Sequence, residues 1–470
     1  MSSFSESIDD DLDTGSGSSS SDSNRAVDRL QEVKKYFVNE GLQFRKVIAQ
    51  GNHGGAVLFD QWLPVEPEPV SAQAATSDSD NDGGSAPEPL MQRRQVVIKY
   101  ALDTKDDATS DNDEDLRNEY NWLRRLSGAE HIIRILPEYN YLWRTRSNRN
   151  RSDSNAGEEG QEAVLSHPVI VMEYLQNGTL DQLINRFGHI NRRIPQRLIW
   201  SFALCLLRAV AGIAYPDQFD GRRRREMPER GDLSTIVQGS WKGLNVLIGD
   251  VQEGLDDPEH SLAPALKVID FGRGREEDPE ADPYWQELKG LSDNLAGVAW
   301  VLQDLADAPN ARDLYGAGDY RLWRASQSDL FDPYDFTTGA SQQVLANEKL
   351  DKDLRDLIAM CLAGHRHHMP TLRELLILCR AGRRKSAEDF RHLYAKEDDN
   401  QSQGQAQAQG EGENDGDQEW LCETDDAIRE TMQRVVFDAD FDPERYADLP
   451  LDELGVHLTA EYLSTLSIDQ

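Results

Sequence analysis

Two residues with metal-binding oxygen atoms flank short apolar runs in the middle of the chain. Asn245 directly precedes the run 246–248, and Asp270 directly follows the run 266–269. Such runs predict a buried hairpin, which would point the amide and the carboxylate into one cleft. Mg2+ prefers oxygen ligands and usually takes only one or two from protein, with phosphates and water supplying the rest. The pair therefore predicts a magnesium site for phosphoryl transfer.

The residues around this pair form two longer motifs. Residues 270–272 resemble the D-F-G motif of protein kinases. Residues 238–245 resemble the kinase catalytic loop, H-R-D-x-x-x-x-N, whose final Asn is a metal ligand. By this resemblance Asn245 and Asp270 bind Mg2+, and the nucleotide is ATP.

Three positions of the catalytic loop differ from the family pattern. Gln238 stands where the family has His, Gly239 where it has Arg, and Ser240 where it has the catalytic Asp. Lys242 keeps the lysine that Ser/Thr-specific kinases carry two residues later, so Ser240 and Lys242 occupy the catalytic positions. A neutral serine hydroxyl cannot act as a base near pH 7, and general-base assistance contributes typically about 100- to 10,000-fold.

Two N-terminal stretches fit a nucleotide site. Residues 48–59 carry glycines between apolar runs, as in a hairpin whose backbone amides approach phosphates. Gly51 and Gly54 match the second and third glycines of the kinase G-x-G-x-x-G loop, although this stretch alone equally fits an ordinary hairpin. Lys99 ends the β-branched strand 96–99 and matches the phosphate-pairing lysine of V-A-I-K.

A predicted helix over 115–126 continues the family order. Its periodicity places Glu119 where the family has the glutamate that pairs with the strand lysine, here Lys99. A solvated helical glutamate is the alternative for this stretch alone. One turn further, Leu123 is expected to pack toward Phe271 and to tie the helix to the metal loop.

Later segments match the hinge and the helical part of the family. The apolar strand 169–175 resembles the kinase hinge, with the backbones of Glu173 and Leu175 facing the adenine. Residues 195–215 predict a long buried helix rather than a membrane span, because polar residues interrupt the apolar run. Asp293 matches the aspartate of a later helix that anchors the catalytic loop.

These motifs follow the family order over residues 41–380. The chain is identified as similar to a divergent eukaryotic protein kinase-like family, of the fungal-type kinase-like proteins. The resemblance implies an α+β, two-lobed fold, in which a small antiparallel β-sheet lobe with one helix accompanies a larger helical lobe. It also implies ATP and Mg2+ as cofactors.

Three functions remain open at this point. The missing Asp favours a nucleotide-binding pseudokinase with a signalling or scaffolding role. An active Ser/Thr protein kinase with weak or atypical catalysis is the second, because Lys242 remains and phosphoryl transfer depends mostly on positioning and electrostatics. A small-molecule phosphotransferase of the aminoglycoside-kinase type is the third, since Gly239 and the absence of A-P-E fit it.

Polar, acidic segments interrupt and extend this domain. Their low apolar content cannot offset the entropy cost of ordering, which predicts disorder. The segments are the tail 1–25, the insertions 62–92 and 144–166, and the linker 397–418. One flanking helix is expected over 26–40 and another over 424–437, inside the C-terminal tail 381–470, where it would dock on the helical lobe or on a partner.

Charge and cysteine usage limit partners and compartment. The net charge of −35 over 470 residues argues against nucleic acid or an anionic membrane and favours a protein partner or substrate, for which a basic surface is the natural match. The four cysteines show no C-x-x-C spacing and no matching histidine cluster, so the sequence predicts neither a zinc site nor a disulfide framework. A reduced, intracellular compartment follows, cytoplasmic or nuclear.

Overall fold

A computed structural model describes thirteen stretches of the chain, and the structural statements below concern these residues. They are residues 20–51, 53–64, 90–102, 111–139, 165, 167–219, 225–228, 233–252, 259–277, 286–308, 320–326, 332–394 and 420–438. The expected insertion 144–166, apart from Leu165, and the expected linker 397–418 lie outside them.

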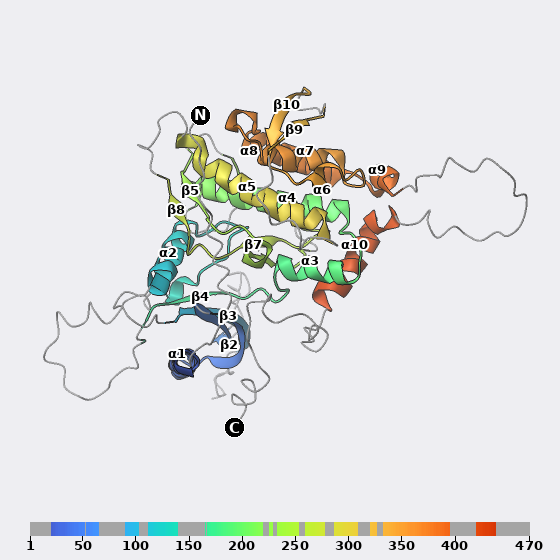
Figure 1. Ribbon diagram of the computed structural model, residues 1–470. Coiled ribbons are helices and arrows are strands. Elements are labelled where there is room, and N and C mark those ends of the chain that lie inside the picture. The colour runs from blue at the N-terminus through green and yellow to red at the C-terminus, as the bar shows by residue number, and fades with distance from the viewer. Residues whose placement is uncertain are drawn as a thin grey trace, which may run out of the picture. The chain divides into compact units, whose positions relative to one another are not determined.

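Helices and a small antiparallel sheet together build the described chain, which is compatible with the predicted α+β class (Figure 1). The chain divides into two compact units. The first contains Met1–Asp113, Leu142–Val169 and Gly455–Gln470, and the second contains Glu114–Tyr141 and Ile170–Leu454. Each unit is described by itself.

The first unit consists of a helix and an antiparallel β-meander. Helix α1 (Ser20–Asn39) ends at Gly41, whose φ of +84° allows the left-handed turn that closes the helix. Strand β1 (Gln43–Gln50) then pairs with β2 (Gly54–Pro64), and β2 pairs with β3 (Met91–Ala101). The hairpin expected over 48–59 is therefore confirmed.

Two boundaries in this unit differ from the expectation. Helix α1 begins at Ser20, so the last residues of the predicted disordered tail 1–25 are helical. Strands β2 and β3 remain paired as far as Pro64 and Met91, so both ends of the predicted insertion 62–92 belong to the sheet. Polar residues are compatible with a strand at these positions because every second side chain can face solvent.

The second unit is mostly helical. Its elements, in chain order, are α2 (Asp111–Arg125, which starts in the first unit), β4 (Val169–Glu173), α3 (Leu180–His189), α4 (Gln196–Ala214), β5 (Ile236–Val237), β6 (Val246–Ile248), β7 (Leu266–Val268), β8 (Arg275–Glu276), α5 (Gln286–Ala306), β9 (Arg321–Arg324), β10 (Asp335–Thr338), α6 (Gln342–Leu345), α7 (Lys352–Cys361), α8 (Leu372–Arg384), α9 (Ala387–Phe390) and α10 (Asp425–Met432). Between α2 and β4, single bridges join Ile132 to Val268 and Ile135 to Met172.

Helix α4 is the centre of this unit and packs against α5 and α8 (Figure 1). It is the one described helix that is long and apolar enough to cross a membrane, but 94% of that stretch is buried inside the protein. The expected buried helix over 195–215 is therefore confirmed as a core helix.

Helix α10 docks on the same unit. Thr424 caps it as expected, and Ile428, Met432 and Val436 join the core around α4. The carboxylate of Glu423 accepts hydrogen bonds from the first two backbone N–H groups of α4, at 2.6 and 3.0 Å. The C-terminal segment thus satisfies helix donors that the preceding proline leaves without a side-chain cap.

Candidate functional site

Strands β6 and β7 form the hairpin that the sequence predicted around Asn245 and Asp270. Val246 pairs with Val268, and the backbone N–H of Ile269 donates to the carbonyl of Asn245 at 2.9 Å. Asn245 and Asp270 therefore leave the hairpin at the same end. This is the placement that a shared metal site requires.

The loop before β6 is ordered around Ser240. Asn245 donates from Nδ2 to the carbonyl oxygen of Ser240 and to its hydroxyl oxygen, both at 2.8 Å. These bonds use the amide nitrogen, so the remaining polar atom of the side chain, Oδ1, can act only as an acceptor or a metal ligand. Asn245 is buried, while Ser240 is half-buried.

Gln238 connects this loop to the Asp270 loop. Its side chain donates to the carbonyl oxygens of Ile269 at 3.1 Å and Asp270 at 2.8 Å. Its side-chain oxygen accepts from the backbone N–H of Ser240 at 2.7 Å. One fully buried amide, at the position of the family's His, thus fixes both loops relative to each other.

The anchoring residue on α5 is Asn294, and the expectation of Asp293 was wrong by one position. Asn294 is buried, and its Oδ1 accepts from the backbone N–H of Gln238 at 2.9 Å. Asp293 instead lies on the outer side of the helix, 36% exposed, 3.7 Å from Arg275 and 4.0 Å from Arg366. A helix turns by about 100° per residue, so neighbouring positions face different directions.

Gly239 can take its backbone conformation because it has no side chain. Its φ is +80°, and a Cβ there would overlap with the carbonyl oxygen of Arg273. An arginine, which the family has at this position, would require both strain and movement of the Arg273 loop. The glycine is therefore a structural requirement of this loop.

Asp270 has a strained backbone. Its φ is +62°, a region that residues other than glycine seldom occupy. Such outliers cost about 1–3 kcal/mol and gather at functional sites. Phe271 follows with its side chain fully buried, which helps to hold the turn.

Helix α2 is tied to the Asp270 loop by hydrogen bonds from Asn118. Asn118 donates to the carbonyl oxygens of Gly272 at 2.7 Å and Gly274 at 2.6 Å. The contact of Leu123 with Phe271 stays a prediction, although both side chains are buried. A polar residue on an amphipathic helix gives no signal of such a long-range bond.

Lys242 is exposed beside the loop. Burial raises the pKa of the nearby Asp181 carboxyl, while a hydrogen bond from Asn185 and the charge of Lys242 act in the opposite direction. Lys242 is therefore an exposed lysine whose charge acts on Asp181.

The expected hinge residues occupy β4 and the turn after it. Glu173 pairs through its side chain with Lys267 of β7 and accepts from the backbone N–H of Arg134 at 2.9 Å. Leu175 follows the strand and lies half-buried. That their backbones face an adenine stays a prediction.

The remaining site candidates divide between the two units. Gly51 and Gly54 flank the β1–β2 turn, and Lys99 lies in β3 opposite Ala56. Glu119 is buried on α2. Since Lys99 and Glu119 belong to different units, their pairing stays a prediction.

No model of a known protein family matches the chain, and no curated protein matches it significantly. The case for function therefore depends on geometry. The hairpin end offers one amide oxygen and one carboxylate to a cation, with a hydroxyl at Ser240 and no carboxylate at that position. Such a site suits Mg2+ with a phosphate ligand better than proton abstraction.

Proposed function

We propose that this chain is a protein kinase-like, nucleotide-binding protein of two lobes that acts as a pseudokinase, with a signalling or scaffolding role toward a protein partner. One observation carries the proposal. Asn245 and Asp270 leave the β6–β7 hairpin at the same end, while Asn245 orders Ser240 at 2.8 Å where a base would be needed. The chain thus keeps the two proposed metal ligands but has a serine at the position of the catalytic base.

The surroundings of the loop support this proposal. Gln238, Asn294 and Asn118 use three neutral amides to fix the two loops, an arrangement that positions metal ligands without supplying a proton acceptor. Gly239 leaves no arginine to receive an activating phosphate, so regulation by phosphorylation of the following segment is not expected. The cysteines form no disulfide within the described residues, which fits a reduced, intracellular compartment.

ATP and Mg2+ are the proposed ligands. Asp270 and the Oδ1 of Asn245 would hold the metal, which would neutralise the nucleotide phosphates. By the family resemblance, Lys99 and the N–H groups of the turn at Gly51 and Gly54 are the phosphate-binding candidates of the first unit. The residues fit this role because each offers the hard oxygen ligand or the cation that a magnesium–phosphate group requires.

Calorimetric titration of the full chain with ATP, with and without Mg2+, tests the proposal. Lys99→Ala should lower the affinity for ATP by about tenfold or more, both with and without Mg2+. Asp270→Asn should lower the affinity for ATP by about tenfold or more mainly when Mg2+ is present. Lys46→Ala is the matched control, because Lys46 is an exposed lysine on β1, a strand of the same sheet that is separated from β3 by β2. Unchanged Mg-ATP affinity in both folded variants would refute the nucleotide site.

A further inference from the structure

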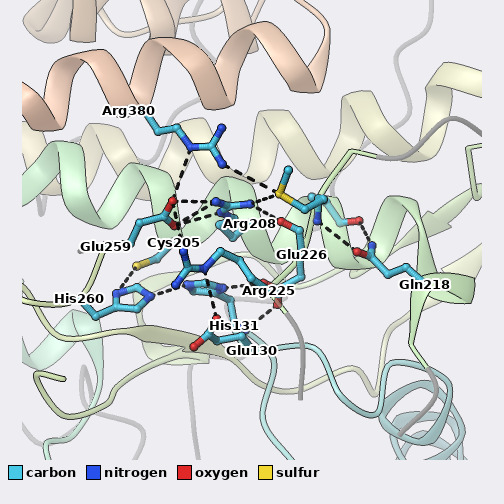
Figure 2. Close-up of polar contacts among 12 residues, drawn as sticks. Glu130, His131, Cys205, Arg208, Gln218, Arg225, Glu226, Glu259, His260 and Arg380 are labelled. Carbon is cyan, nitrogen blue, oxygen red and sulfur yellow. Dashed lines mark hydrogen bonds and ion pairs between the residues drawn. The ribbon is translucent and has the colours of Figure 1, made fainter. Parts of the chain in front are cut away.

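A second group of titratable side chains is buried in the helical unit. His131, Cys205 and His260 are 0%, 2% and 1% exposed, and each offers a ligand atom within 4.8 Å of the other two (Figure 2). They come from the turn after α2, the middle of α4 and the segment before β7. Burying polar side chains costs free energy that apolar side chains at the same positions would not cost, so a buried group of this kind calls for a functional explanation.

The spacing of the two imidazole nitrogens fits one tetrahedral metal ion. Nε2 of His131 lies 3.2 Å from Nε2 of His260. Two imidazole nitrogens bound to Zn2+ at about 2.0–2.1 Å with tetrahedral angles lie about 3.3–3.4 Å apart. The sulfur of Cys205 is instead near the other ring nitrogen of His260, at 3.9 Å from Nδ1. A histidine binds a metal ion through one nitrogen, so the three ligand atoms, which lie within 4.8 Å of one another with one taken from each residue, must draw closer for the sulfur to reach the ion.

Two hydrogen bonds with the Glu226 carboxylate orient the imidazole of His131. Nδ1 of His131 is 2.7 Å from the Glu226 carboxylate, whose other oxygen accepts from the backbone N–H of His131 at 2.6 Å. A carboxylate on the far nitrogen of a histidine is the usual support for a metal-binding imidazole, since it fixes the ring and leaves Nε2 for the metal. Glu226 is itself fully buried.

Unlike Glu226, Glu259 pairs with arginines around this group. Arg208 holds Glu259 through two nitrogens, with bonds of 2.8 to 3.2 Å, and also donates to the carbonyl oxygen of Glu226 (Figure 2). Arg225 and Arg380 lie 3.8 and 3.5 Å from the same Glu259. The charge of Glu259 is therefore compensated by arginines.

We propose that His131, Cys205 and His260 bind a Zn2+ ion, with Glu226 as the positioning residue for His131. Thiolate and imidazole are the donors that zinc prefers.

The sequence could not predict this site, since the three ligands are separated by dozens of residues and only the fold brings them together. The ion would join α4 to the turn after α2 and to the segment before β7. That turn is also bonded to β7, because the backbone N–H of Val268 donates to the carbonyl of His131 at 2.9 Å. A zinc ion would thereby stabilise the strand that leads to Asp270.

Metal analysis of the full chain, purified without a metal-affinity step, tests the proposal. The wild type should contain one zinc per chain, and Cys205→Ser should lose it. Cys361→Ser is the matched control, because Cys361 is equally buried but lies outside the group of ligands. Replacement by Co2+ should give a thiolate-to-metal charge-transfer band in the wild type and in Cys361→Ser, and no such band in Cys205→Ser.

Glu226→Gln provides a variant that keeps the shape of the site if Cys205→Ser fails to fold. It should still bind zinc, but about 10- to 100-fold more weakly in competition with a chromogenic chelator. Folded wild-type protein that holds no zinc and gives no cobalt band would overturn the proposal and leave a hydrogen-bonded chain from Cys205 to Glu226. Equal zinc in Cys205→Ser and Cys361→Ser would overturn it too, by placing the metal elsewhere.

Discussion

The side-chain oxygen of Asn294 lies 2.9 Å from the backbone nitrogen of Gln238 and fixes the start of the Ser240 loop on α5. The same oxygen accepts from the indole N–H of Trp241 at 3.0 Å, and the amide nitrogen donates to the carbonyl of Ile236 at 2.8 Å. Asn294→Ala would leave these buried groups without partners. We expect it to lower the free energy of unfolding by about 2–4 kcal/mol, measured by urea denaturation.

Asp293→Ala is the control for this prediction. Its side chain is partly exposed and its two ion pairs are long, so its loss should cost less than about 1 kcal/mol. A larger effect at Asp293 than at Asn294 would mean that the family's aspartate position is the anchor after all.

We expect the side chain of Asn118 to stabilise the packing of α2 against the Asp270 loop. Asn118→Ala removes both hydrogen bonds to the loop and should destabilise the protein by about 1–2 kcal/mol. Hydrogen exchange should rise in the peptides that contain Gly272 and Gly274. Asn121→Ala, on an exposed position of the same helix, should stay within about 0.5 kcal/mol of the wild type. Equal exchange in the two variants would contradict the role given to Asn118.

Gly239 and Gly272 should respond differently to the same change. Gly239→Ala forces a side chain into φ +80° and against Arg273, so a loss of at least about 1–3 kcal/mol is expected. At Gly272 the nearest atoms to an added Cβ are 3.5 Å away, an ordinary contact, and Gly272→Ala should be neutral or slightly stabilising. Thermal unfolding of both variants measures the difference, and similar melting temperatures would argue against strain at Gly239.

Local patterns were enough to predict the parts of the fold that depend on neighbouring residues. Apolar runs predicted the β6–β7 hairpin, and Thr424 predicted the start of α10. The polar composition of 62–92 predicted an insertion, but both ends of this segment are strand residues. A strand with one solvent-facing side accepts charged residues as readily as a loop does.

Contacts between distant segments could not be predicted in this way. The difference between Asp293 and Asn294 depends on the rotation of α5 against the loop, which no local pattern specifies. The same holds for the bond from Asn118 and for the buried group around His131. In each case the residue type is common on protein surfaces, and only the fold gives it a partner.

The stability that Asp60 provides should depend on pH in a defined direction. Burial alone would raise the pKa of this carboxyl, but hydrogen bonds from Arg45 at 2.6 Å and Gln95 at 3.2 Å, with the charges of Arg45 and Arg93, hold the pKa below its usual value of 3.8. A lowered folded-state pKa stabilises the protein above the unfolded pKa, and this contribution is lost as pH falls through the folded pKa.

Asp60→Asn should therefore be less stable than the wild type by about 1–3 kcal/mol at pH 7, and the difference should shrink only below about pH 4. Urea midpoints of both proteins between pH 7 and pH 3.5 give the comparison. Asp28→Asn, at an exposed position of α1, is the control for replacing a carboxylate by an amide elsewhere in the same unit. A gap that narrows already between pH 7 and pH 5 would indicate another titrating group.

Ser240→Asp tests whether the missing base is what limits catalysis. The hydroxyl of Ser240 accepts from Asn245 at 2.8 Å, and an introduced carboxylate could accept the same bond while facing an incoming substrate hydroxyl. Transfer from labelled ATP to generic basic and acidic proteins should appear or rise, by up to about 100- to 10,000-fold if positioning is otherwise adequate. A smaller gain is expected if the short segment after Gly272 offers no platform for a peptide.

Two controls make the result of Ser240→Asp decisive. Adding Asp270→Asn to this variant should abolish the gain, since the proposed metal ligand is lost, and a gain that survives would point to a contaminating kinase. ATP hydrolysis is measured beside transfer, because a base without a bound acceptor activates water instead. If the wild type already transfers phosphate at ordinary kinase rates and Ser240→Asp adds nothing, another group orients the acceptor, and the chain is an active kinase rather than a pseudokinase.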